Sequence, residues 1–256
     1  MTIATIIHGF SSCPSTNDLA KRLAREGSAE GTVVLADEQT QGRGTKGRSW
    51  HSARGFGIYA SVILRPRRTD LSLLPLAAGV ACLEAIREAT GLEAALEWPN
   101  DIVWKRRKVG GILCEGEFLG NALSFAVLGI GLNVSQKSDD FPAELRRTAT
   151  SLRLALGREV DRAGLEKALW SALDRWYVAW VRGRKDDVVR EYESKLVVPA
   201  GAFVEVRKEE GTLRGVYRGV DLQARLRIEK DGKEVLLSPA EILAIDYNQG
   251  ALKKET

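Results

Sequence analysis

The chain is poor in the side chains that bind metals or form covalent cross-links. Its 256 residues include two histidines, His8 and His51, and three dispersed cysteines, Cys13, Cys82 and Cys114. An odd number of distant cysteines excludes a disulfide framework, and so few imidazoles exclude a conventional zinc site. We therefore expect no metal site built from the protein alone, and a reducing, cytoplasmic environment.

The sequence also lacks a targeting or membrane-spanning segment. The N-terminal apolar stretch is too short for a signal sequence and has no basic residue before it. No run of about 18 apolar residues follows, so we expect no membrane partner. A net charge of +4 is too small to indicate by itself that the protein binds nucleic acid. One local cluster of basic residues is nevertheless sufficient to bind an anionic small molecule.

Composition and periodicity predict a globular α+β protein. Hydrophobic residues make up 44% of the chain and charged residues 28%. We expect strands over residues 3–7, 32–36, 57–64, 94–98, 102–104, 109–118 and 122–129, and helices over residues 19–25, 71–89, 165–181 and 186–195. This order predicts a mixed, mostly antiparallel sheet with flanking helices, a helix or two lying on one face.

Two helix starts carry recognisable polar signals. Residues 15–18 are small and polar, and we expect them to cap the helix 19–25. Asp70 is placed to cap the long helix and Gly91 to end it, although Pro75 favours a later start. Large apolar residues of the helix 165–181 recur at helical spacing, and we expect them to lie in the core.

The pattern of the sequence changes after Pro199. Short strands broken by charged turns are expected over residues 203–207, 213–218, 224–228 and 234–237. Turn signals at this spacing predict a small all-β barrel. We therefore expect two domains, residues 1–198 and 199–256.

A glycine-rich basic loop, residues 42–50, is the most informative segment. Glycine reaches positive φ at low cost, so such a backbone can fold its amides around a phosphate while Arg43, Lys46 and Arg48 supply charge. The loop has neither the Gly-Lys-Ser/Thr ending of a Walker A motif nor Rossmann glycine spacing. Taken alone, it favours an anion-binding loop, with a solvated basic loop as the less favoured alternative.

Three further clusters carry groups able to bind a ligand. In Trp98-Pro-Asn-Asp101, proline restricts the backbone beside an amide and a carboxylate, and a self-capping turn is the alternative. Lys108-Val-Gly-Gly-Ile-Leu113 places a lysine beside paired glycines that let a ligand approach the backbone, with a basic hairpin tip as the alternative. The segment 129–133 ends another strand with glycines and Asn133.

Together these segments resemble the biotin-protein ligases. The resemblance rests on Ser15-Thr-Asn17, on Gln39 with residues 42–50, and on the clusters at 98–101, 108–113 and 129–133, in the same order and at similar spacings. It continues through residues 219–222 and so spans nearly the whole chain. It implies a class II synthetase-like catalytic domain followed by an SH3-like barrel.

The implied activity is biotin-[acetyl-CoA-carboxylase] ligation in two half-reactions. The biotin carboxylate attacks the α-phosphate of Mg-ATP, and the products are biotinyl-5'-AMP and pyrophosphate. The implied cofactors are therefore ATP and Mg2+. A lysine of the biotin carboxyl carrier protein then attacks the mixed anhydride and AMP leaves. Because a carboxylate and a polyanion repel each other, fixed cations at the phosphorus are the main help a protein can give.

The resemblance also assigns roles to individual residues. Lys108, Arg43, Arg48 and Asp101 would be catalytic, with Asp101 orienting or deprotonating the incoming lysine. Biotin would be held by Ser15, Thr16, Asn17, Gln39, Gly42, Arg43, Gly44, Lys108, Gly110 and Gly111. The nucleotide would be bound by Arg43, Lys46, Arg48, Trp50, Asn100, Lys108 and Asn133.

The sequence departs from the family pattern in two places. Thr45 stands where the loop normally has arginine, and Lys46 is the neighbouring cation that could compensate. The chain starts only a few residues before the first expected strand, so we expect no helix-turn-helix in front of it and no DNA partner. Relatives commonly form dimers, which makes a homodimer one allowed outcome.

Two other functions compete with this interpretation. A lipoate ligase or octanoyl transferase shares the catalytic fold but not this glycine loop. A nucleic-acid-binding module would use the basic loop on phosphates and the barrel on bases, with weak, steeply salt-dependent binding. The second alternative leaves the segment 98–101 unexplained.

Overall fold

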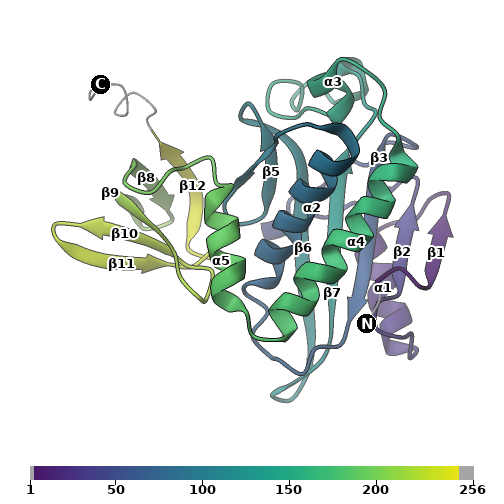
Figure 1. Ribbon diagram of the computed structural model, residues 1–256, viewed down its shortest axis with the longest axis horizontal. Helices are drawn as coiled ribbons and strands as arrows, with labels where there is room; N and C mark the ends of the chain where they lie inside the picture. Colours follow the sequence, from purple (N-terminus) through teal and green to yellow (C-terminus); the bar gives the residue numbers. More distant parts are fainter. Residues whose placement is uncertain (1–2, 248–256) are drawn as a thin grey trace.

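Two sheets organise the chain in the computed structural model, which describes residues 3–247. The larger sheet has the order β1-β2-β3-β7-β6-β5-β4 (Figure 1). Its first pair, β1 and β2, is parallel, and all its other pairs are antiparallel. The strands are β1 (Ile7–Phe10), β2 (Val33–Ala36), β3 (Gly57–Leu64), β4 (Ala95–Glu97), β5 (Asp101–Trp104), β6 (Arg107–Leu119) and β7 (Ala122–Asn133).

Helices cover both faces of this sheet, so the expectation of helices on one face was wrong. They are α1 (Thr16–Arg25), α2 (Leu74–Thr90), α3 (Leu152–Leu156), α4 (Arg162–Val181) and α5 (Lys185–Ser194). Successive strand residues point to opposite faces. Val33 belongs to the core beneath α2, whereas Val34 packs with Ala20 and Ala24 of α1. The run 32–36 is buried on both faces, and it therefore needs a helix on each.

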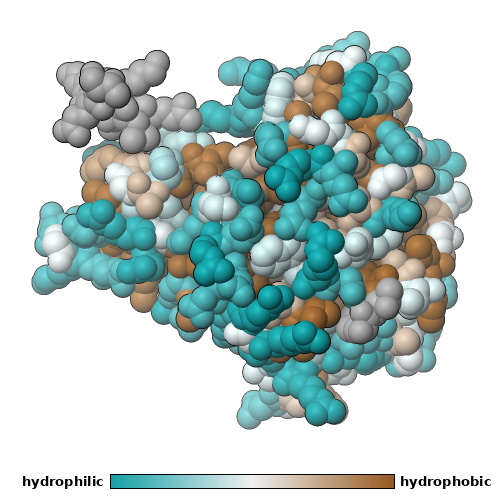
Figure 2. Space-filling view, in the orientation of Figure 1, coloured by the Kyte–Doolittle hydropathy of each residue, from teal (hydrophilic) through white to brown (hydrophobic). Residues whose placement is uncertain are grey.

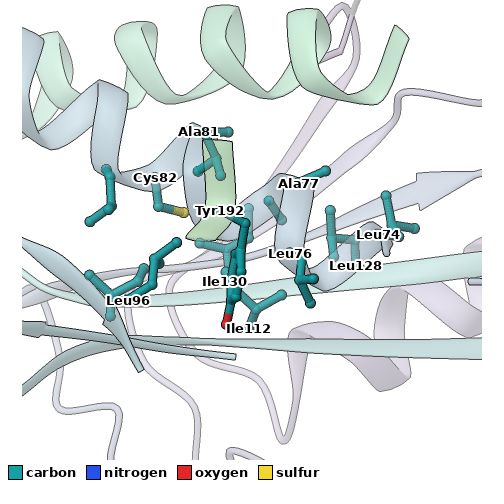
Figure 3. Packing of buried hydrophobic residues seen from close by; sticks show 14 of the residues in the cluster. Leu74, Leu76, Ala77, Ala81, Cys82, Leu96, Ile112, Leu128, Ile130 and Tyr192 are labelled. Atoms are coloured by element: carbon teal, nitrogen blue, oxygen red, sulfur yellow. The ribbon is translucent and has the colours of Figure 1, made fainter. Parts of the chain in front are cut away.

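Helix α2 lies in the centre of the main core (Figure 3). Small residues such as Ala77 and Ala81 let it approach the sheet closely, and its neighbours there include Leu128 and Ile130 of β7. Tyr192 of α5 closes the same core and donates a hydrogen bond from its hydroxyl to the carbonyl of Pro99 at 3.1 Å. The core thus fixes the turn that leads into Asp101.

The starts of α1 and α2 differ from those predicted by the sequence. Helix α1 begins at Thr16, after Ser15 at its N-cap position, but no side chain makes the expected capping hydrogen bond. Thr16 and Asn17 lie buried in the first turn of the helix instead. Asp70 accepts hydrogen bonds from Ser72 and does not cap α2. Pro75 lies in the first turn of α2, where a missing N–H loses no hydrogen bond. Gly91 ends α2 at φ 75°, as expected.

The first strand was misplaced by the sequence. We expected it over residues 3–7, but β1 pairs Ile7 with Val33 and Phe10 with Ala36. Ile3 is buried ahead of the strand, in a turn held by the hydrogen bond from Ala4 N to Gly31 O at 2.9 Å. Apolar character at the start of the segment therefore reflects core contact and not strand pairing.

The C-terminal strands form a separate antiparallel sheet of order β11-β10-β9-β8-β12. They are β8 (Phe203–Lys208), β9 (Gly211–Val220), β10 (Leu226–Lys230), β11 (Lys233–Leu237) and β12 (Ile242–Tyr247), the last of which was not expected. Trp98 Nε1 donates to the carbonyl of Ala224 at 3.0 Å and joins this sheet to the larger unit. Figure 2 shows a largely hydrophilic surface over α4 and α5. None of the helices within residues 3–247 is long and apolar enough to span a membrane.

Candidate active site

The glycine loop, residues 42–50, connects β2 to β3 as a tight hairpin. Trp50 N donates to Gly42 O at 2.8 Å, and Gly44 N donates to Arg48 O at 2.6 Å. A Cβ on Gly42 would collide with the Trp50 carbonyl oxygen, which explains the glycine there. Lys46 adopts φ 57° at the tip. The hairpin thus places Lys46 at its tip and Arg43 and Arg48 on its two arms.

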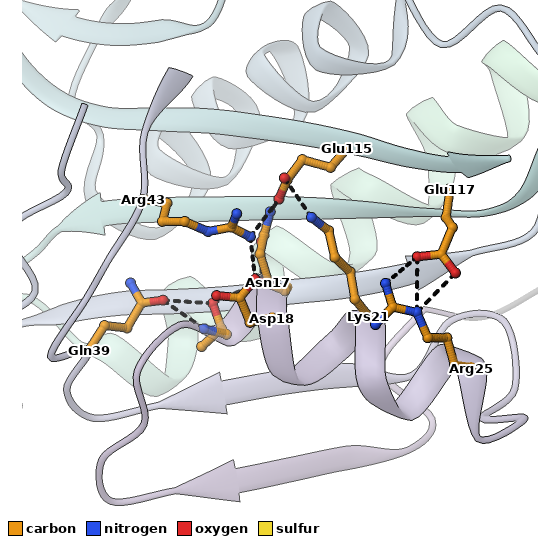
Figure 4. Close-up of polar contacts among 10 residues, drawn as sticks. Asn17, Asp18, Lys21, Arg25, Gln39, Arg43, Glu115 and Glu117 are labelled. Carbon is orange, nitrogen blue, oxygen red and sulfur yellow. Dashed lines mark hydrogen bonds and ion pairs between the residues drawn. The ribbon is translucent and has the colours of Figure 1, made fainter. Parts of the chain in front are cut away.

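Arg43 points into the protein and contacts two carboxylates (Figure 4). Its Nη2 lies 2.6 Å from Asp18 Oδ1 on α1 and 3.0 Å from Glu115 Oε2 on β6. Its Nε is buried and has no hydrogen-bond partner among the described residues. Arg43 is therefore anchored by one nitrogen and keeps an unused donor.

The other two loop cations turn away from Arg43. Arg48 Nη2 donates to Thr45 Oγ1 at 3.0 Å, and its Nε donates to the Thr45 carbonyl at 3.3 Å. Lys46 Nζ donates to the carbonyl of Ile242 in the C-terminal sheet. Lys46 is thus held by the second sheet, whereas Arg48 is folded onto its own loop.

A polar floor lies at the start of α1. Thr16 donates to Gln39 Oε1 through both its backbone N (2.8 Å) and its Oγ1 (3.0 Å). Gln39 Nε2 donates in turn to Ser52 Oγ at 2.8 Å. Ser61 Oγ from β3 lies 2.8 Å from Thr16 Oγ1 and donates to Asn17 Oδ1 at 2.5 Å. This network fixes an amide and several hydroxyls at one end of the site.

Lys108 stands at the opposite end beside Asp101. Lys108 Nζ lies 2.7 Å from Asp101 Oδ1 and 5.5 Å from the centre of the Trp50 ring. Asn100 Nδ2 donates to the Ile112 carbonyl at 2.9 Å and so ties the turn to β6 instead of capping itself. The turn therefore positions a carboxylate directly against the lysine.

Glycines of β6 and β7 form the wall between these two ends. A Cβ on Gly111 would meet Trp50 Cζ3 at 3.4 Å, and a Cβ on Gly131 would meet Trp50 Cε2 at 2.6 Å. A Cβ on Gly129 would collide with Asn17 Oδ1. The Trp50 indole can approach β7 this closely only because Gly131 has no side chain. Its Nε1 is buried without a partner among residues 3–247.

Asn133 lies at the far end of β7 and is buried. Its Nδ2 donates to the Thr150 carbonyl at 3.1 Å, and its Oδ1 accepts from Gln136 Nε2 at 3.1 Å. These bonds join the end of β7 to the segment that precedes α3. Asn133 therefore orients that segment as well as lining the site.

Most of the expected site residues surround one cavity of about 330 Å³. Its size is in the range of small-molecule sites. The residues expected at the site that line it are Ser15, Thr16, Asn17, Gln39, Arg43, Gly44, Arg48, Trp50, Asn100, Asp101, Lys108, Gly111 and Asn133. The cavity thus brings most of the expected residues together from distant parts of the sequence.

Three expected residues lie outside the cavity lining. Gly42 shapes the loop hairpin, and Lys46 contacts the C-terminal sheet. Gly110 faces away from the cavity, since a Cβ there would lie 2.6 Å from Leu132 Cδ2. Their assigned roles in binding stay predictions.

Sequence reasoning missed two parts of the site. One is the wall formed by Phe141, Leu145, Thr148 and Ala149, which lies in an irregular segment without a motif. The other is Glu115. Because Glu115 follows Gly111 by four residues in a strand, it faces the same side, and this even spacing is the signal that could have found it.

Glu115 is ionised at neutral pH despite its partial burial. Burial acts to raise the pKa of Glu115, but hydrogen bonds from Asn17 and Lys21 and the charges of Lys21 and Arg43 lower it below the ordinary glutamate value. The carboxylate is therefore available to hold Arg43 as an ion pair.

Comparisons with known proteins agree with this geometry. Residues 9–133 match the model of the biotin/lipoate A/B protein ligase family. The chain is 38% identical over 220 residues to the bifunctional ligase/repressor BirA of Bacillus spizizenii, covering 84% of this chain and 66% of that protein. It thus spans just under two thirds of that relative's length.

Two further relatives are matched over most of their length. The biotin–[acetyl-CoA-carboxylase] ligase of Mycobacterium tuberculosis is 33% identical over 238 residues, covering 90% of this chain and 85% of the relative. The solved structure of the Aquifex aeolicus biotin protein ligase in complex with biotin and ATP superposes with a TM-score of 0.82 at 27% identity, covering 95% of this chain and 100% of that one. The chain therefore belongs to the biotin protein ligase family.

Proposed function

We propose that this chain joins biotin to a specific lysine of a biotin carboxyl carrier protein through biotinyl-5'-AMP. The observation that carries the proposal is the convergence of Arg43, Arg48 and Lys108 on one cavity that also contains the polar floor around Gln39. Such a cavity can hold a small polar ring at one end and a reacting pair of anions at the other. The names of the relatives, and the biotin and ATP of the Aquifex structure, support the same reaction.

The polar floor would bind the ureido ring of biotin. Ser15, Thr16, Asn17 and Gln39 offer hydroxyl and amide groups already fixed by hydrogen bonds, so little side-chain entropy is lost on binding. The wall at Gly111 would admit the aliphatic part of biotin close to the strand backbone.

The loop cations and Lys108 would promote adenylation. A carboxylate oxygen of biotin attacks the α-phosphorus of ATP, the bond from this phosphorus to the oxygen bridging to the β-phosphate breaks, and pyrophosphate leaves. Arg43 and Arg48 would offset the repulsion between the two anions, and Lys108 would contact both the acyl oxygen and the α-phosphate. Arg43 can take part because its Nε has no acceptor among the described residues.

Trp50, Asn100 and Asn133 would face the nucleotide, and Mg2+ would enter with it as Mg-ATP. Mg2+ keeps several waters and commonly takes most of its other ligands from substrate phosphates. Within residues 3–247, no three His, Cys, Asp or Glu side chains cluster as a metal site. We therefore assign Mg2+ to the substrate.

Asp101 would serve the second half-reaction. The ion pair with Lys108 occupies Asp101 in the present structure. Once Lys108 contacts the adenylate, Asp101 becomes available to the ammonium of the incoming lysine and can accept its proton. The amine then attacks the acyl carbon, and the bond to AMP breaks.

The remaining expectations belong to the same proposal. The C-terminal sheet would be an SH3-like barrel beginning near residue 199, and Lys46 would couple it to the loop. A cytoplasmic location and a homodimer fit this function.

Biotin-dependent exchange of labelled pyrophosphate into ATP tests the proposal directly. We expect exchange with biotin and none with lipoate, because a dithiolane ring has no hydrogen-bonding groups for the floor at Gln39. Exchange with lipoate alone would establish the lipoate ligase alternative. Absence of exchange with either acid would refute adenylation at this site.

A further inference from the structure

Arg43 is held by two carboxylates that differ in how firmly they are themselves fixed (Figure 4). Glu115 has a side chain 24% exposed; its Oε1 accepts from Lys21 Nζ at 2.6 Å and its Oε2 from Asn17 Nδ2 at 2.7 Å. The Asp18 side chain is 54% exposed, and Arg43 is the one ion-pair or hydrogen-bond partner of its carboxylate within residues 3–247. The Glu115 carboxylate is therefore fixed by neighbouring side chains, whereas the Asp18 carboxylate can leave Arg43 without breaking any other ion pair or hydrogen bond in the described part of the chain.

The guanidinium of Arg43 cannot keep both carboxylates and also bind a ligand anion through two nitrogens. Both carboxylates lie against the same nitrogen, Nη2 of Arg43. A guanidinium can bind an anion through two nitrogens at once along either of two edges. One edge pairs Nε with Nη2 and the other pairs Nη1 with Nη2, so both edges include Nη2. An incoming carboxylate or phosphate can therefore obtain a bidentate contact only if one of the two acids leaves Nη2.

We propose that Glu115 is a positioning residue that holds Arg43 throughout the reaction, and that Asp18 is the exchangeable partner displaced by the anionic group of the ligand. This inference rests on the proposed function, since it takes the ligand anion to be the carboxylate of biotin or the phosphate of biotinyl-AMP. It assigns opposite effects to two acids that touch the same atom.

Neutralising each acid in turn separates the two roles. Asp18→Asn removes the competing anion, so biotinyl-AMP should dissociate more slowly, by about three- to tenfold. Glu115→Gln removes the anchor, so biotinyl-AMP should dissociate about tenfold faster or more, because a charge-assisted contact becomes misaligned. Glu117→Gln is the matched control: Glu117 lies on the same face of β6 and pairs with Arg25 of α1. It should leave the dissociation rate unchanged.

A neutral ligand distinguishes positioning of Arg43 from a general structural role. Biotinamide keeps the ring and chain of biotin but lacks the negative charge, and titration calorimetry measures its affinity. Glu115→Gln keeps an amide oxygen that can accept the hydrogen bond from Asn17 Nδ2, so the polar floor is retained. The variant should therefore weaken the binding of biotin and biotinyl-AMP but not that of biotinamide. Equal weakening of biotin and biotinamide would overturn the inference, as would faster dissociation of biotinyl-AMP from Asp18→Asn.

The two levels of the proposal fail in different ways. If the wild-type chain binds neither biotin nor biotinamide, the proposed function fails. If it binds both and the two acids behave alike, only the inference fails. Should Glu115→Gln not fold, the Asp18→Asn arm still decides, since an unchanged dissociation rate would contradict displacement of Asp18.

Discussion

Replacing Lys108 with alanine should remove most adenylation while leaving the fold intact. Lys108 provides a charge-assisted contact that strengthens as negative charge develops at the reacting phosphorus. The loss of one such contact costs about 2–4 kcal/mol, or roughly thirty- to a thousandfold in rate. The structure favours the upper half of this range, because the substitution also leaves Asp101, 2.7 Å from Lys108, without its cation and facing the reacting anions.

The fold should tolerate this substitution. The Lys108 and Asp101 side chains are 31% and 22% exposed, so solvent screens the pair, and such pairs contribute about 0–1 kcal/mol. For a protein of this size, that corresponds to a change in Tm of at most roughly 2–4 °C. Thermal unfolding followed by circular dichroism measures it.

Quenched single-turnover formation of biotinyl-AMP is the assay for the chemical step. Adding Asp101→Asn to Lys108→Ala should restore part of the rate, since the unbalanced carboxylate is then gone. A rate for Lys108→Ala within about threefold of wild type would show that Lys108 does not act in the transition state.

Three further predictions concern the loop, the glycine wall and the anchor of Arg43. Thr45→Arg adds a loop cation and should slow the escape of biotinyl-AMP about ten- to a hundredfold in stopped-flow dissociation. An unchanged or faster rate would mean that loss of the 3.0 Å contact from Arg48 to the Thr45 hydroxyl offsets the added charge. Gly131→Ala should raise the KM for ATP, because a Cβ would lie 2.6 Å from the Trp50 ring and displace the indole; an unchanged KM in steady-state exchange would contradict this. The pKa of Glu115 is lowered in the folded state, so its stabilisation is complete above the unfolded pKa and is lost as the pH falls through the folded value. Glu115→Gln should therefore be less stable than wild type in urea at neutral pH, and the difference should close below about pH 4, whereas a difference independent of pH would refute the ion pair.

Strong local signals predicted much of the fold. The run 57–64 is a strand with the expected ends because it is apolar on both faces and ends near turn residues. Gly91 ends α2 because glycine adopts its left-handed conformation without strain. The strand β1 was misplaced because its position depends on pairing with β2, and residues such as His8 and Gly9 carry little strand propensity.

The candidate site was predictable where residues form a motif and unpredictable where tertiary packing selects them. The glycine loop and the segment around Lys108 could be found because glycine and charge are unusual together. Asp18 could not be assigned, since a single acidic residue on a helix is an ordinary surface residue until the fold places it against Arg43. The same packing turns Lys46 toward the C-terminal sheet.

The proposed ligase activity is tested most directly by locating the attached biotin on an acceptor protein. The purified chain is incubated with biotin, Mg-ATP and a biotin carboxyl carrier domain, and the modified residue is identified by mass spectrometry. We expect biotin on a single lysine of the carrier, with one AMP and one pyrophosphate released for each biotin attached. Consumption of ATP without biotin on the carrier, or attachment of lipoate in preference to biotin, would contradict it.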